Sequence, residues 1–96
     1  MSDVVASAVE SLNQRLGGGG FDGVAKFVIA DEGALVIDSD GARAGDGRAD
    51  VTLTADAATF RAILDGEINA TAAFMQGRLA IDGDMGAAMR LGSVLA

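Results

Sequence analysis

The first apolar residues of the chain repeat with the period of a helix. They recur about every 3.6 residues and leave the polar residues on the opposite side. Ser2 is suited to cap the start of this helix, and the glycines of residues 17–20 are suited to end it. The repeating positions are Val5, Ala8, Val9, Leu12 and Leu16. This pattern predicts an amphipathic helix followed by a glycine hinge.

The next stretches alternate apolar and polar residues, which is typical of strands with one buried face. They cover residues 21–30, 34–38 and 50–55, and a fourth covers residues 78–82. The short polar segments between the first three predict an antiparallel meander. Helical segments precede the fourth, so we expect it to join through a right-handed crossover. The expected inward face carries Phe27, Ile29, Leu35, Ile37, Val51, Leu53, Leu79 and Ile81.

Capping residues predict three further helices. Asp56 is suited to start a short helix that stops at Gly66, Asn69 a second that ends at Gly77, and Asp84 a last one. Because only one face of the sheet is apolar, all helices should lie on that side. We therefore expect a single domain over residues 1–96 of the two-layer α+β class. Its sheet should be largely antiparallel, with four to five strands and the helices packed on one face.

The last helix allows two interpretations. Gly86 and Gly92 weaken a helix, and Met85 and Met89 are flexible side chains, so the helix could be a loosely held lid. Alternatively, the methionines are ordinary core residues and the glycines allow close packing. The pattern alone favours the core interpretation.

Composition narrows the function classes. A net charge of −7 with no His disfavours nucleic acid and anionic membrane surfaces as partners. The lack of Cys and His removes thiolate nucleophiles and the commonest metal ligands. No apolar run approaches the roughly 20 residues of a membrane span, so we expect a cytoplasmic domain without stable membrane insertion.

The acidic residues do not predict a catalytic or metal site. Asp38 and Asp40 begin like a calcium loop, but Ala42 and Arg43 stand where a ligand and the turn glycine are needed. Most other carboxylates fall in expected turns, and no His or suitable Lys adjoins a Ser or Thr in sequence. We expect no enzyme activity, no metal and no cofactor.

The C-terminal half carries a recognisable series of segments. DVTLT at residues 50–54 is followed by FMQGRLAI at 74–81 and GDMGAAMRL at 83–91. With the preceding helix, glycine hinge and strands in the same order, this series resembles the sterol carrier protein type 2 domain family, the nonspecific lipid-transfer proteins.

The resemblance implies a hydrophobic tunnel that holds a lipid without cofactor chemistry. The implied function is binding and carriage of a long-chain lipid, which could be a fatty acid, a fatty acyl-CoA, or a sterol-like or isoprenoid lipid. Gln76 matches a family position near the cavity that could contact a polar head. By the same resemblance, the tunnel should be lined by Phe60, Ile63, Leu64, Phe74, Met75, Leu79, Ile81, Met85 and Met89.

A different function class would use the same apolar residues. In this alternative the groove is covered by another protein chain, and the domain is a protein-interaction or dimerisation module. The partner could be a second copy of the chain. It could also be an enzyme, in which case the domain would be an accessory factor of lipid or quinone metabolism.

Overall fold

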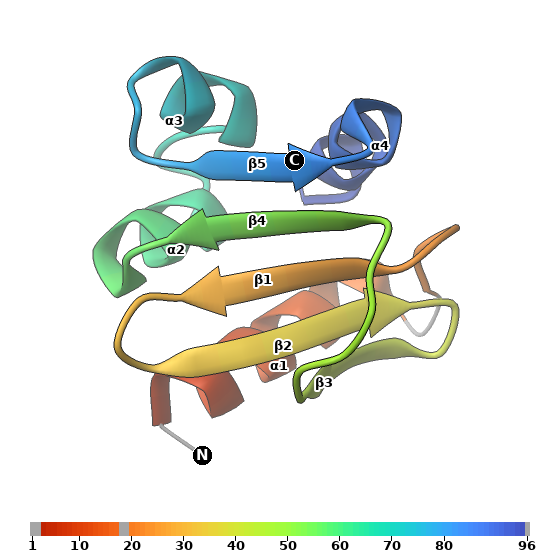
Figure 1. Ribbon diagram of the computed structural model, residues 1–96. Coiled ribbons are helices and arrows are strands. Elements are labelled where there is room, and N and C mark those ends of the chain that lie inside the picture. The colour runs from red at the N-terminus through yellow and green to blue at the C-terminus, as the bar shows by residue number, and fades with distance from the viewer. Residues whose placement is uncertain (1–2, 18–19, 96) are drawn as a thin grey trace.

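The computed structural model describes residues 3–17 and 20–95, which form a mixed sheet of five strands and four helices (Figure 1). The strand order is β3-β2-β1-β4-β5. The strands are β1 (Ala25–Ile29), β2 (Gly33–Asp38), β3 (Gly41–Ala44), β4 (Val51–Ala55) and β5 (Ala80–Gly83). The helices are α1 (Asp3–Leu16), α2 (Ala57–Leu64), α3 (Ala70–Met75) and α4 (Met85–Leu95). The predicted α+β class is confirmed.

The predicted meander is wrong. β1 pairs antiparallel with β2, with Phe27 opposite Leu35, but it pairs in parallel with β4, with Phe27 opposite Leu53. The reason is β3, a short strand absent from the sequence prediction, which pairs with β2 and occupies the edge that β4 would otherwise extend. Its sequence, GARA, contains small residues without apolar alternation and therefore gave no strand pattern.

The predicted crossover to the last strand is also wrong. β5 lies antiparallel beside β4, with Leu53 opposite Ile81, and it forms the edge of the sheet in Figure 1. A crossover joins parallel strands, whereas here α2 and α3 connect two antiparallel neighbours. The apolar face of the sheet therefore ends at an open edge, which β5 forms.

The predicted helix starts are confirmed for α2, α3 and α4. Side-chain oxygens of Asp56, Asn69 and Asp84 accept backbone N–H groups of the first turns at 2.7, 2.7 and 2.9 Å. After α2 and α3 the chain reverses at Gly66 and Gly77, whose φ angles of 79° and 76° favour glycine. These caps make α2 and α3 short and well bounded.

α1 is held against the sheet by one polar side chain as well as by its apolar stripe. The Asn13 amide donates to the carbonyl of Ala42 at 3.0 Å, and its oxygen accepts the N–H of Ala42 at 2.8 Å. The amide thus pairs with β3 as a neighbouring strand would. The expected cap Ser2 and the hinge residues Gly18 and Gly19 lie outside the described residues.

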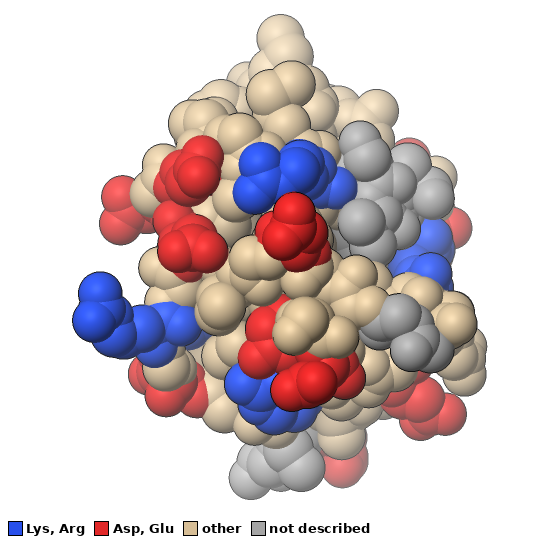
Figure 2. All heavy atoms as spheres, turned by 90° about the vertical axis from the view of Figure 1, so that its right-hand side faces the viewer, with Lys and Arg blue, Asp and Glu red and all other residues tan. Residues whose placement is uncertain are grey.

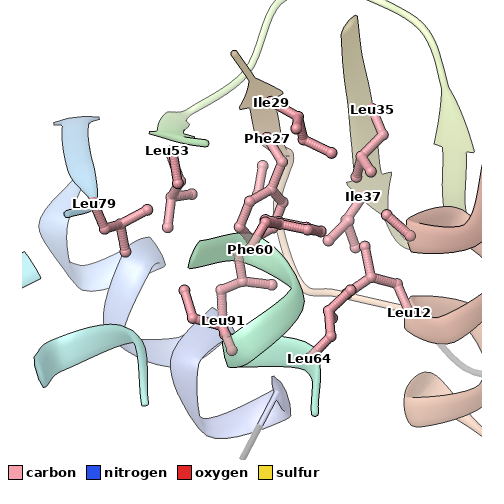
Figure 3. Packing of buried hydrophobic residues seen from close by; sticks show 14 of the residues in the cluster. Leu12, Phe27, Ile29, Leu35, Ile37, Leu53, Phe60, Leu64, Leu79 and Leu91 are labelled. Atoms are coloured by element: carbon pink, nitrogen blue, oxygen red, sulfur yellow. The ribbon is translucent and has the colours of Figure 1, made fainter. Parts of the chain in front are cut away.

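The core lies between the sheet and the helices, all on one face, as Figures 1 and 3 show. At its centre, the rings of Phe27 and Phe60 meet edge to face, with centroids 4.6 Å apart. The contact joins the middle of the sheet to α2. Around it pack the buried residues labelled in Figure 3, among them Leu12, Ile29, Leu35, Ile37, Leu53, Leu64, Leu79 and Leu91.

Candidate functional site

An apolar groove of about 530 Å³ lies between α3 and α4. Leu53 and Ile81 contribute from the paired strands β4 and β5, and the rest of the wall comes from α3 with its capping residue and from α4. We call this hollow the groove. Its lining residues are Leu53, Asn69, Ala70, Thr71, Phe74, Met75, Ile81, Met85, Ala88, Met89 and Gly92.

Large apolar side chains are exposed in the groove. Phe74, Met75, Met85 and Met89 have exposed fractions of 43%, 80%, 47% and 73%. They are the large hydrophobic residues that are exposed in the described part of the chain, and all of them line one hollow. A clustered apolar surface of this kind marks a binding site, and methionine side chains adapt to the shape of what they contact.

A tight turn positions the α3 wall. The carbonyl of Ala73 accepts hydrogen bonds from the N–H groups of Arg78 and Leu79, at 2.9 and 3.2 Å. These bonds fold the start of the β5 segment back against α3, while Ala73 and Leu79 are buried in the core. Phe74 and Met75, on the last turn of α3, therefore lie at the open edge of the sheet.

α4 separates its packing residues from its groove residues. Ala87 and Leu91 are buried, whereas Met85, Met89 and Gly92 follow the helical repeat along the groove. The core interpretation of Met85 and Met89 is wrong, because both side chains are exposed. The open edge beside β5 is the reason, since no further element covers this side of α4 among the described residues.

The structure brings together half of the residues that the resemblance implies. Phe74, Met75, Ile81, Met85 and Met89 line the groove. Four others, Phe60, Ile63, Leu64 and Leu79, are buried in the core and do not line it. Gln76 is the exposed C-cap residue of α3 and also lies outside the lining.

Several groove residues were not among the predicted site residues. Asn69 was predicted only as a helix cap, whereas Ala88 and Gly92 were placed in the last helix without a role in the groove. Their shared stripe with Met85 and Met89 is a signal that could have placed them in the wall. Leu53, Ala70 and Thr71 carry no such signal, because only the pairing of β4 with β5 and the position of α3 bring them to the groove.

A smaller hollow of about 240 Å³, which we call the side hollow, adjoins the groove. Asn69, Ala70 and Gly92 line both. The remaining lining residues of the side hollow are Arg15, Ile63, Gly66 and Ile68. The two hollows are therefore neighbours that share one boundary.

A hollow of about 820 Å³ lies at the other side of the molecule, around the turn between β1 and β2. Three acidic residues, Asp31, Glu32 and Asp46, line it together with Val5, Val28, Ile29, Ala30, Gly33, Ala34, Ala44 and Gly45. None of the large exposed apolar side chains belongs to it. The groove is therefore the better candidate for an apolar ligand.

Two ion pairs join residues that lie outside the lining of the groove. Arg43 pairs with Asp38 at 2.7 Å, and this hydrogen bond lowers the pKa of the Asp38 carboxyl below its usual range. Lys26 pairs with Asp46 at 2.9 Å. On the face drawn in Figure 2, basic side chains likewise have acidic neighbours. The described lining of the groove contains no charged residue, whereas Arg15 lines the adjoining side hollow.

Within residues 3–17 and 20–95, the structure shows neither a metal-binding cluster nor a helix able to span a membrane. No group of three or more His, Cys, Asp or Glu side chains there could hold a metal ion. None of the helices in the same ranges has the length and apolar character that spanning a membrane requires.

Comparison with known sequences identifies relatives. The model of the SCP-2 sterol transfer family matches residues 9–96. Hydroxysteroid dehydrogenase-like protein 2 of Danio rerio is 39% identical over 82 residues. The match covers 77% of this chain but only 20% of that protein, so the chain spans about a fifth of the relative's length.

Comparison with solved structures identifies the fold. A sterol carrier protein 2 from Aedes aegypti in complex with palmitate superimposes with a TM-score of 0.78 at 23% identity, covering 100% of this chain and 97% of the other. Sterol carrier protein 2 like 2 from the same organism gives a TM-score of 0.77 at 23% identity, covering 95% of each chain. At this identity, the likeness concerns the fold.

Proposed function

Because the chain belongs to the SCP-2 sterol transfer family, we propose that it binds and carries a long-chain lipid in the groove between α3 and α4. The observation that supports this most directly is the gathering of Phe74, Met75, Met85 and Met89, all exposed, around one hollow. Burial of apolar surface stabilises a complex by roughly 25 cal/mol per Å², so an acyl chain that covers these side chains gains affinity along its whole length.

Fatty acids are the first ligands to test, because palmitate occupies a solved structure with the same fold. Flexible methionines discriminate poorly between chains of similar shape, so we expect modest selectivity among fatty acids, fatty acyl-CoA and sterol-like or isoprenoid lipids. A closed tunnel, as implied by the family resemblance, would require the exposed methionines to move over the ligand.

We propose carriage without covalent chemistry. The polar side chains of the groove are those of Asn69 and Thr71, and Asn69 already caps α3 through its oxygen. Neither residue type is a general base, and a threonine hydroxyl needs an adjacent base to act as a nucleophile. If the chain acts within a longer protein like its relative, it would supply lipid to chemistry performed elsewhere.

The proposal is tested by placing a charge in the groove. Met89→Asp should abolish binding of a fluorescent fatty acid, because burying a carboxylate against an acyl chain is costly. Ala58→Asp is the matched control, since Ala58 is exposed on α2 and lies outside the groove lining. Normal affinity in Met89→Asp, with both variants folded by circular dichroism, would exclude the groove as the lipid site.

A partner protein is the second candidate occupant. Met75 and Met89, exposed by 80% and 73%, would suit a contact with another chain. Native mass spectrometry before and after delipidation separates the candidates. A lipid adds a small mass that delipidation removes, whereas a second copy doubles the mass.

A further inference from the structure

We propose that Gly92 keeps the groove continuous with the side hollow, so that the residue at this position determines how long an acyl chain the protein can hold. The inference rests on lipid binding in the groove, as proposed above. It goes beyond that function because it assigns chain-length selectivity to one residue of α4.

The boundary between the two hollows consists of three residues. Asn69 and Ala70 lie at the start of α3, and Gly92 lies on α4. The Asn69 side chain is held by its hydrogen bond to the N–H of Ala72, at 2.7 Å, so the α3 side of the boundary is fixed. The residue at position 92 therefore decides how much room remains between the two helices.

Packing does not explain a glycine at position 92. A methyl group in place of its hydrogen would have no described atom within 4 Å, apart from its chain neighbours and its own helix backbone. At Gly86 on the same helix, such a methyl would lie 3.2 Å from Oδ1 of Asp84. A helix interior favours alanine over glycine, so the open space at Gly92 calls for another explanation. Access between the hollows supplies one.

The affinity for an acyl chain should depend on how many of its methylenes the two hollows can bury. Each methylene buried from water improves binding by about fourfold, as long as the cavity has room for it. The groove encloses about 530 Å³, and the side hollow adds about 240 Å³. A side chain as large as leucine at position 92 would close the passage, and the methylenes that occupy the side hollow would then lose their contribution.

The test is a chain-length series on three proteins. The parent chain, Gly92→Leu and the control Gly47→Leu are titrated with saturated fatty acids from octanoate to stearate, using displacement of a fluorescent fatty acid. Gly47 is a suitable control because a Cβ atom added there would also have no described atom within 4 Å. Gly47 lies outside the lining of both hollows.

We expect the affinity of the parent and of Gly47→Leu to rise with chain length into the long acids. In Gly92→Leu the rise should stop several methylenes earlier, so that stearate binds about tenfold more weakly or worse while octanoate changes by less than about threefold. Ala70→Leu narrows the same passage from α3 and should shift the series in the same direction. It decides the matter if Gly92→Leu does not fold.

Chain-length series that coincide in the parent, Gly92→Leu and Ala70→Leu would overturn the inference and leave lipid binding intact. A parent protein that binds no acid of the series would instead contradict the proposed function itself. An equal loss for octanoate and stearate in Gly92→Leu would show that the residue blocks the groove as a whole, which also overturns a role in length selection.

Discussion

Leu53 and Ile81 lie directly opposite each other on β4 and β5, yet the first is 2% exposed and the second is only partly buried. Both side chains point to the helix layer, and both line the groove. Leu53, on β4, belongs to the closed core, whereas its partner Ile81, on β5, lies at the open groove. If the groove holds a lipid, as proposed, these neighbours in register have different roles, stability for Leu53 and ligand contact for Ile81.

This pair predicts two separable phenotypes. Leu53→Ala should lower the free energy of unfolding by about 2–5 kcal/mol, because it leaves a cavity in the core. Ile81→Ala should cost less stability, about 1 kcal/mol, and should weaken fatty-acid binding, because its side chain is only partly buried. Urea denaturation and displacement titrations check both values. Equal losses of stability would contradict the boundary between core and groove at β5.

Met89→Leu should change ligand affinity with little effect on stability. Met89 is largely exposed, and surface substitutions usually alter the free energy of unfolding by less than about 0.5 kcal/mol. The flexible thioether adapts to an acyl chain, whereas the branched leucine presents a different surface. Stopped-flow release of a fluorescent fatty acid measures the off-rate. Identical affinity and off-rate in the variant and the parent would show that Met89 does not contact the ligand.

The two glycines of α4 should respond differently to alanine. Gly92→Ala should raise the free energy of unfolding by up to about 1 kcal/mol, since the methyl has free space. Gly86→Ala should gain less, because the new methyl lies 3.2 Å from Oδ1 of Asp84, and that atom accepts the N–H of residue 86 as part of the cap. Thermal unfolding followed by circular dichroism compares them. An equal or larger gain for Gly86→Ala would mean that the cap tolerates the methyl.

The cap of α2 should make stability depend on pH. The backbone N–H of Thr59 binds the Asp56 carboxylate, and this bond, with the Thr59 side chain, lowers the pKa of Asp56. A lowered pKa in the folded state means that the stabilisation is present above the ordinary carboxyl pKa of about 4 and is lost as the pH falls through the lower, folded value.

Asp56→Asn keeps a capping oxygen and removes the titration, so its melting temperature should fall less than that of the parent between neutral and acid pH. Asp56→Ala removes both and should be the least stable variant at neutral pH. If the parent and Asp56→Asn lose the same stability on acidification, the contribution of this carboxylate is absent.

The sequence by itself determined the features that depend on near neighbours in the chain. Asp56, Asn69 and Asp84 were predicted as helix starts because a cap needs only a side-chain oxygen and the N–H groups two or three residues later. The inward positions of the first strands followed from their two-residue period, which any pairing partner would preserve. The family was also identified from ordered local segments, and the match over residues 9–96 confirms it.

Only the tertiary structure decided which strands pair and which apolar residues remain uncovered. The parallel pairing of β1 with β4 depends on β3, whose small residues carry no strand signal of their own. Phe60 and Phe74 are equally apolar in the sequence, but one packs on Phe27 and the other lies at an open sheet edge. Periodicity shows that a residue prefers burial, whereas the position of β5 at the edge of the sheet leaves Phe74, Met85 and Met89 exposed.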